Sequence, residues 1–216
     1  MFQFLDHLSI RNKVWLIMAL FLSAIIAGSV VDVLSIRSTL WAEKELKTRH
    51  LVETAYSVLD RYYGLQKAGK LSEAAARAEA IDTIKALRYD EKEYFWLNNL
   101  GKPFPIMIMH PTVPALDGKV LDAQKFNCAT SQSFGDSAEP VETGGKKNLF
   151  VAMVEVVDKS GEGYVTYNWP KPKASGGVTE ELFPKLSYVK KFEPWAGWWA
   201  PASMWTTWTR RPVRSK

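Results

Sequence analysis

The apolar positions of this chain begin with one long uncharged run near the N-terminus. Residues 14–31, VWLIMALFLSAIIAGSVV, form 18 residues without a charged side chain, just enough for a helix to cross the hydrocarbon of a membrane. Arg11 and Lys13 precede the run, and positive residues stay on the cytoplasmic side. The pattern therefore predicts a transmembrane helix over 14–33, with residues 1–13 in the cytoplasm and the rest of the chain exported.

A cleaved signal peptide is the alternative interpretation of the same run, because it ends in small residues. Cleavage after Ala27 would need a small side chain at the third residue before the cut, counting Ala27 as the first, and that residue is Ile25. The run is also longer than the apolar core of an ordinary signal peptide. We therefore favour an uncleaved anchor.

Helical periodicity continues beyond the apolar run. Residues 33–68 contain no proline and repeat apolar side chains at helical spacing, so they predict one long helix continuous with the span. Gly69 ends this helix, and Ser72 is a candidate N-cap for a second helix through residues 74–87. Movement in the span can then be passed mechanically to the exported part.

The remainder of the chain has mainly strand character. Aromatic and β-branched residues predict a hairpin, two later strands and a short segment whose spacing fits both a helix and a buried strand, of which we favour the helix. The strands are expected at 93–100, 105–111, 161–170 and 185–192, the helix at 149–157, and loops at 112–147 and 171–184. The fold class is therefore α+β, an antiparallel sheet with a long helix on one face.

The net charge of +5 would suit a nucleic-acid-binding protein, but its placement does not. Residues 196–216 contain four basic residues and no acidic one, so the rest of the chain is close to neutral. The single cysteine, Cys128, excludes an intrachain disulfide, and we interpret it as a small buried thiol. Three histidines without metal-ligand spacing, no paired catalytic carboxylates and no phosphate-binding loop predict a protein that is not an enzyme and needs no metal or cofactor.

Several short motifs resemble the single-Cache sensor domains of methyl-accepting chemotaxis proteins. They are DRYY at 60–63, LRYD at 87–90, EYFWLN at 93–98, MHP at 109–111, LDGK at 116–119, YNWPKP at 167–172 and KLSYVK at 185–190. The resemblance implies a sensor domain over 34–195, with a long N-terminal helix and a PAS-like sheet, that binds small ligands outside the cell, often short carboxylates. It also implies a homodimer in the inner membrane with the sensor domain in the periplasm, followed by a second membrane helix, a HAMP linker and a signalling coiled coil.

A carboxylate site needs fixed hydrogen-bond donors and an apolar wall. By resemblance, we expect five side chains to line a cavity on the face of the sheet that the long helix covers, namely Tyr94, Trp96, His110, Tyr188 and Lys190. Four more are candidates to close or flank it, namely Arg61, Tyr62, Tyr63 and Arg88. Each has a plainer alternative: a core aromatic, a histidine that caps a strand end, a solvated lysine, or an arginine at a helix C-terminus.

The end of the chain departs from the family pattern. Residues 196–216 read AGWWAPASMWTTWTRRPVRSK, whereas the family closes its sheet with a strand rich in Gly, Val and Asp. Written back through the single codons of Trp and Met, the DNA read from the third base of the Trp198 codon is compatible with Val-Gly-Thr-Gly-Ile, then Tyr or Asp, then Val-Asp-Asp-Val-Asp. We therefore expect an aberrant, frame-shifted tail; if it is native, we expect the sheet to lack its last strand.

The leading functional hypothesis is ligand sensing by the input domain of a transmembrane chemoreceptor. The same module can instead serve a histidine kinase, and only cytoplasmic sequence separates the two. An anchored binding protein without output is a third possibility. An exported enzyme is a fourth, and no constellation of residues supports it.

Overall fold

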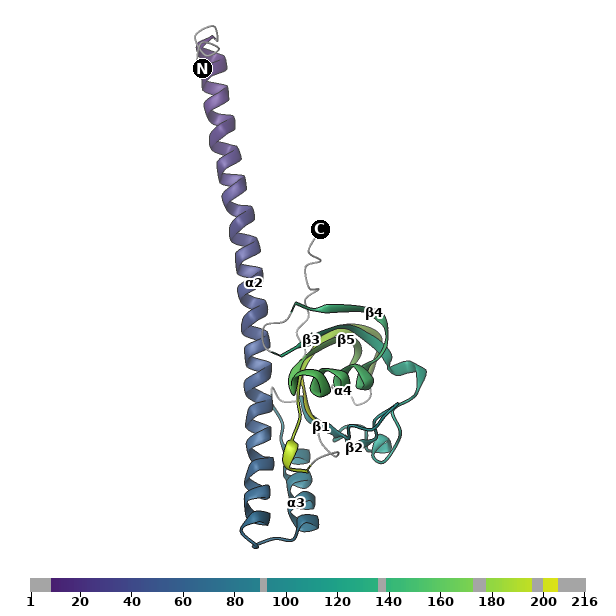
Figure 1. Cartoon of the computed structure of the whole chain (residues 1–216). Helices are drawn as coiled ribbons and strands as arrows, with labels where there is room; N and C mark the ends of the chain where they lie inside the picture. Colours follow the sequence, from purple (N-terminus) through teal and green to yellow (C-terminus); the bar gives the residue numbers. More distant parts are fainter. Residues whose placement is uncertain (1–8, 90–92, 136–138, 173–177, 196–199, 206–216) are drawn as a thin grey trace. The chain divides into compact units, whose positions relative to one another are not determined.

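The computed structural model describes residues 9–89, 93–135, 139–172, 178–195 and 200–205. The chain divides into two units, Met1–Lys44 and Glu45–Lys216. The second unit holds an antiparallel sheet and the helices that pack on it, in the order shown in Figure 1. The predicted α+β class is confirmed.

Helix α2 runs without interruption from Ile10 to Lys67, which confirms the predicted continuity between the apolar run and the long helix. Its side chains over 14–31 are exposed, as apolar residues are when lipid covers them. Among the described residues, α2 is the one helix that is long and apolar enough to cross a membrane.

Helix α3, Glu73–Ala86, begins at the predicted cap, because the Ser72 hydroxyl accepts a hydrogen bond of 3.2 Å from the Ala75 amide. Small side chains at Ala76 and Ala80 let α3 approach α2 closely, as Figure 1 shows beside the last turns of α2. Tyr62 and Thr83 join the two helices through a hydroxyl pair 2.9 Å apart.

Within the described residues, seven antiparallel strands form one sheet in the spatial order β2-β1-β7-β6-β5-β3-β4. Their bounds are Phe95–Asn98 (β1), Met107–Met109 (β2), Asn127–Phe134 (β3), Val141–Asn148 (β4), Glu162–Pro172 (β5), Val178–Lys190 (β6) and Ala200–Trp205 (β7). The hairpin β1–β2 is the predicted one, with Leu97 opposite Met109.

Helix α4, Leu149–Ser160, confirms the favoured interpretation of the ambiguous apolar segment. The Asn148 side chain caps it by accepting hydrogen bonds from the amides of Phe150 and Val151, and Gly161 ends it in the left-handed conformation. The following Gly163 is required by close packing: a Cβ there would lie 2.2 Å from the carbonyl oxygen of Ser133.

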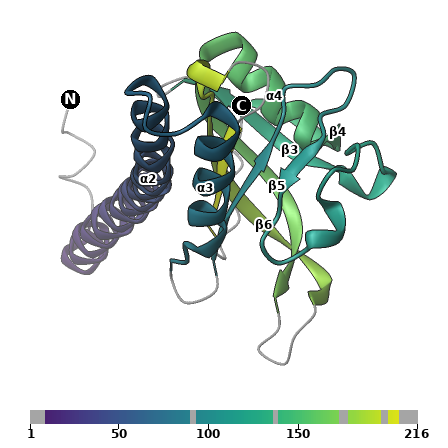
Figure 2. The ribbon, with the colours of Figure 1, turned by 90° about the horizontal axis from the view of Figure 1, so that it is seen from below.

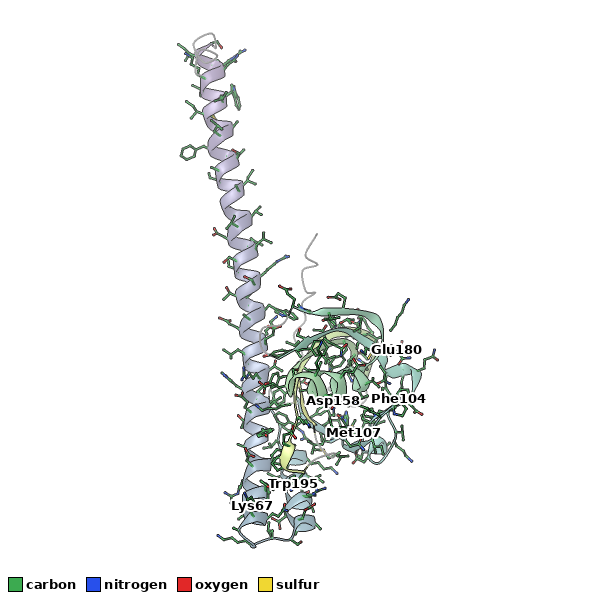
Figure 3. All side chains as sticks on the ribbon, viewed as in Figure 1. Lys67, Phe104, Met107, Asp158, Glu180 and Trp195 are labelled. Atoms are coloured by element: carbon green, nitrogen blue, oxygen red, sulfur yellow. The ribbon has the colours of Figure 1, made fainter. Side chains whose placement is uncertain are left out.

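Two hydrophobic cores lie on opposite faces of the sheet. The first joins the sheet to α4 and includes Tyr94, Trp96, Val165 and Val189. The second joins it to α2 and α3 and includes Phe95, Leu97, Phe192 and Trp195. Figure 2 shows α2 and α3 side by side, away from α4, and Figure 3 shows Trp195 near the end of α2. There its indole Nε1 donates a hydrogen bond of 2.7 Å to Gln66.

Two predicted loops were wrong. Residues 112–147 contain two short 3₁₀ turns, Pro114–Leu116 and Gln124–Phe126, together with β3 and most of β4. Both strands are polar, and their pairing contains register shifts, so the alternation of apolar side chains that marks a strand is missing. The predicted loop over 171–184 is also corrected, because β6 begins at Val178. Pairing with neighbouring strands fixes these segments despite their weak local signal.

The expectation that the chain after Trp195 supplies no strand is corrected over Ala200–Trp205. These residues form β7, which pairs with both β1 and β6 and closes the sheet between them. The backbone of β7 satisfies ladder hydrogen bonds of both neighbours, which explains why the sheet takes a strand there whatever its composition. The frame shift itself stays a prediction, and residues 196–199 and 206–216 lie outside the described part of the chain.

Candidate ligand-binding site

Tyr94 and Trp96 enter the core on the α4 face of the sheet, so their predicted place on the face that the long helix covers is wrong. They are 3% and 2% exposed, and the residues that alternate with them, Phe95 and Leu97, join the opposite core against α2 and α3. Burial raises the pKa of the Tyr94 hydroxyl well above its ordinary value, so this group stays a neutral donor or acceptor.

His110 follows β2 and lies against both of these aromatic side chains. Its ring centre is 5.0 Å from that of Tyr94 and 6.5 Å from that of Trp96. The Asp117 carboxylate accepts the His110 amide hydrogen at 2.7 Å, and His110 Nδ1 accepts the Val113 amide hydrogen at 3.1 Å. Because Nδ1 is an acceptor, the neutral ring carries its proton on Nε2.

A buried lysine that was not among the predicted site residues lies on the same face. Lys185 is 2% exposed and stands opposite Tyr167 in the β5–β6 pair. Burial and the charge of Lys185 lower the pKa of His110 to about 4, so the imidazole is neutral near pH 7. Tyr167 and Ser187 complete this part of the sheet with a hydroxyl pair 2.9 Å apart.

One donor of this cluster has no hydrogen-bond partner within the described residues. Trp96 Nε1 is buried and unpaired, which costs free energy unless a further group accepts its hydrogen. Glu93, two residues before β1, is buried beside Tyr94 in the sequence, and its charge adds to the burial that raises the pKa of Tyr94. The cluster therefore combines a cation, fixed neutral donors and an apolar surround.

The structure separates Tyr188 and Lys190 from this cluster. They alternate with Ser187 and Val189 on β6 and so face α2. The Tyr188 ring lies 4.9 Å from the ring of Tyr164, and Lys190 Nζ is 2.7 Å from a carboxylate oxygen of Glu162. The period of two was visible in KLSYVK, but the sequence alone does not say which face is covered by α4.

The remaining candidates also lie away from the cluster. Tyr62 bonds to α3, and Tyr63 packs edge-on against Phe192 and Trp195 in the opposite core. The structure places Arg61 on the exposed side of α2. Arg88 Nη1 donates to the carbonyls of Lys85 and Leu87 at 2.6 and 2.7 Å, which is the helix-terminal role given above as its alternative.

Comparison with known proteins identifies the family. The Cache domain matches residues 28–199, which is most of the chain. The chain belongs to the Cache family. Methyl-accepting chemotaxis protein McpP of Pseudomonas putida is 37% identical over 194 residues, which cover 90% of this chain. They cover 31% of that receptor, so the Cache chain spans about a third of its relative's length.

Solved Cache structures share the fold. A periplasmic sensor domain of a chemotaxis protein is 34% identical with a TM-score of 0.58, over 76% of this chain and 96% of that domain. A Cache chemosensory domain described by its carboxylic acid recognition is 35% identical with a TM-score of 0.59, over 79% and 98%. A methyl-accepting chemotaxis protein of Vibrio parahaemolyticus, 16% identical with a TM-score of 0.53 over 77% and 91%, supports the fold alone.

Proposed function

We propose that this Cache domain is the periplasmic input domain of a homodimeric transmembrane chemoreceptor of the inner membrane, and that it senses a short carboxylate. The proposed ligand site is the cluster of Tyr94, Trp96, His110 and Lys185 on the α4 face. Its support comes from the apolar span in α2, from the chemotaxis relatives, and from a 35% identical Cache domain described by carboxylic acid recognition. The proposed role is binding and signalling, without catalysis.

The chemistry of the cluster suits a carboxylate because that group only accepts hydrogen bonds. Lys185 supplies positive charge, His110 presents its Nε2 hydrogen, and Trp96 presents its Nε1 hydrogen. Charge-assisted hydrogen bonds are roughly twice as strong as neutral ones, so a carboxylate gains more here than its uncharged amide. The aromatic rings then enclose a short apolar remainder of the ligand.

The observation that carries the proposal is the buried lysine on the same sheet face as an unpaired buried indole donor. The experiment is a thermal-unfolding screen of the full chain in detergent against acetate, propionate, lactate, pyruvate and succinate, each beside its own amide. A ligand that binds only the folded state raises Tm by mass action. At least one carboxylate should raise Tm while its amide does not; a panel without any shift would refute direct carboxylate sensing.

A further inference from the structure

Polar contacts join helix α2 to the face of β5 and β6 opposite α4. They are separate from the cluster of Tyr94, Trp96, His110 and Lys185. Glu162 begins β5, and its carboxylate forms ion pairs with Lys190 Nζ at 2.7 Å and with Arg49 Nη2 at 3.6 Å. Arg49 belongs to α2, where its Nε also pairs with Glu53 at 2.8 Å. One carboxylate of the sheet therefore joins both a strand and the long helix.

Aromatic contacts reinforce the same junction. The Tyr164 hydroxyl donates a hydrogen bond of 3.1 Å to the carbonyl oxygen of Glu45 on α2. The Tyr188 ring lies 4.9 Å from the Tyr164 ring and 6.0 Å below the Arg49 guanidinium. Lys190 Nζ also lies 5.3 Å from the centre of the Tyr56 ring, so these contacts hold the helix segment 45–56 against β5 and β6. The hydrophobic contacts of α2 in the second core begin further along the helix, at 51–63.

Burial and neighbouring charges act in opposite directions on Glu162. Its partial burial favours the neutral acid, but the hydrogen bond from Lys190 and the charges of Lys190 and Arg49 outweigh burial and lower its pKa. The Glu162 side chain is 23% exposed and the Arg49 side chain is 27% exposed, so solvent screens the ion pair only partly.

Strand β6 connects this link directly to the proposed ligand cluster. Lys185 and Ser187 face α4, whereas Tyr188 and Lys190 face α2, and the β5–β6 register is regular between Glu162 and Pro170. A displacement of β6 by a group that binds Lys185 therefore moves the partners of Glu162 at the same time, because adjacent residues of one strand share one backbone.

We propose that Glu162 is a positioning residue that couples occupancy of the Lys185 cluster to the segment 45–56 of α2, through Lys190 and Arg49. This inference rests on the proposed function of the cluster. It assigns the helix that continues into the apolar run a part in signal transfer. Coupling between two sites is a free energy that each perturbs in the other, so a change at Lys185 and a change at Glu162 should not act independently.

The test is hydrogen exchange of amides 45–56 in the full chain in detergent, without added ligand. Lys185→Met is introduced into the wild type, into Glu162→Gln and into a control variant, and exchange is compared with and without it in each background. The matched control is Glu73→Gln, which removes an ion pair of α3 with Arg77, 2.6 Å long, and whose contact with α2 is at Gln66, outside the segment 45–56. Lys185→Met should accelerate exchange of 45–56 at least about fivefold in the wild-type and Glu73→Gln backgrounds, and should add nothing in the Glu162→Gln background.

An equal acceleration in all three backgrounds, or none in the wild type, would overturn the coupling. If Lys185→Met does not fold, Ser187→Ala replaces it, since it perturbs the same face through the Tyr167 pair. No carboxylate ligand is added in the exchange experiments, so their outcome is separate from that of the ligand screen. A screen without a Tm shift refutes carboxylate sensing. Equal effects of Lys185→Met on exchange in all backgrounds refute the coupling.

Discussion

Lys185 stands directly opposite Tyr167 in the β5–β6 pair, and both side chains are buried on the face of the sheet that α4 covers. A lysine ammonium in such a place is costly unless it is paired or functional. Its charge reaches His110, whose pKa it lowers together with burial. The pairing of Lys185 with Tyr167 therefore places a positive charge beside the aromatic residues of the proposed ligand site.

Replacing Trp96 by Phe should separate binding from stability. The substitution removes an indole donor that is buried without a partner in the described structure, so Tm should change by less than the usual cost of a core mutation. Carboxylate affinity should fall about tenfold, because a hydrogen bond to a charged group is lost. Calorimetric titration beside a melting curve checks both; a large loss of Tm with unchanged affinity would make Trp96 a core residue only.

His110 makes a prediction for the pH dependence of stability. Its folded pKa of about 4 lies below the ordinary 6.5, so between these values the unfolded chain binds a proton that the folded chain does not. Titration of His110 therefore leaves the free energy of unfolding unchanged above about pH 6.5 and lowers it as pH falls, by up to about 3 kcal/mol at pH 4.

The measurement is urea unfolding of the wild type and His110→Asn from pH 7 to pH 4. The difference between the two free energies of unfolding should shrink as pH falls, because asparagine does not titrate. A difference that stays constant over this range would show that His110 is not held neutral by its surroundings.

Glu162 contributes to the pH dependence with the same sign as His110, at lower pH. Its pKa is lowered in the fold, so its contribution is present above the ordinary carboxyl pKa and is lost as pH falls through the folded value. Glu162→Gln should cost about 1 kcal/mol at pH 7 and progressively less below about pH 4.5. Thermal unfolding at pH 7 and pH 3.5 checks this, and raised salt should reduce the cost at pH 7 as well. An equal cost at both pH values would contradict the ionic role.

Gly163 and Gly64 form a matched pair for alanine substitution. A Cβ at Gly163 meets the Ser133 carbonyl oxygen at 2.2 Å, so Gly163→Ala should cost about 3 kcal/mol or more. Gly64 lies in α2 with nothing within 4 Å of the added Cβ, so Gly64→Ala should stabilise by about 0.5–1 kcal/mol. Chemical unfolding measures both; a Gly163→Ala variant as stable as the wild type would contradict the close approach of β5 and β3.

The elements with strong local signals were predictable from the sequence. The apolar run, the Ser72 cap and the hairpin around residues 101–104 all follow from periodicity and turn chemistry, and the structure confirms the helices and strands expected there. Strands β3 and β4 were missed because their residues are polar and their register shifts, so only tertiary pairing makes them strands.

The candidate site was predictable in part. Alternation placed Tyr94 and Trp96 on one face, the family resemblance grouped His110 with them, and the three rings lie close together in the structure. Lys185 was missed because a period of two assigns residues to two faces without saying which face α4 covers. That choice depends on the packing of elements distant in sequence, so Tyr188 and Lys190 were grouped with residues on the opposite side of the sheet.

The most direct test of the central claim is calorimetric titration of the full chain and of Lys185→Met with the carboxylate that raises Tm most, beside the corresponding amide. The wild type should bind the carboxylate and not the amide, and Lys185→Met should lose at least about tenfold in carboxylate affinity while remaining folded. Equal affinity of a folded Lys185→Met variant for the carboxylate would contradict the account.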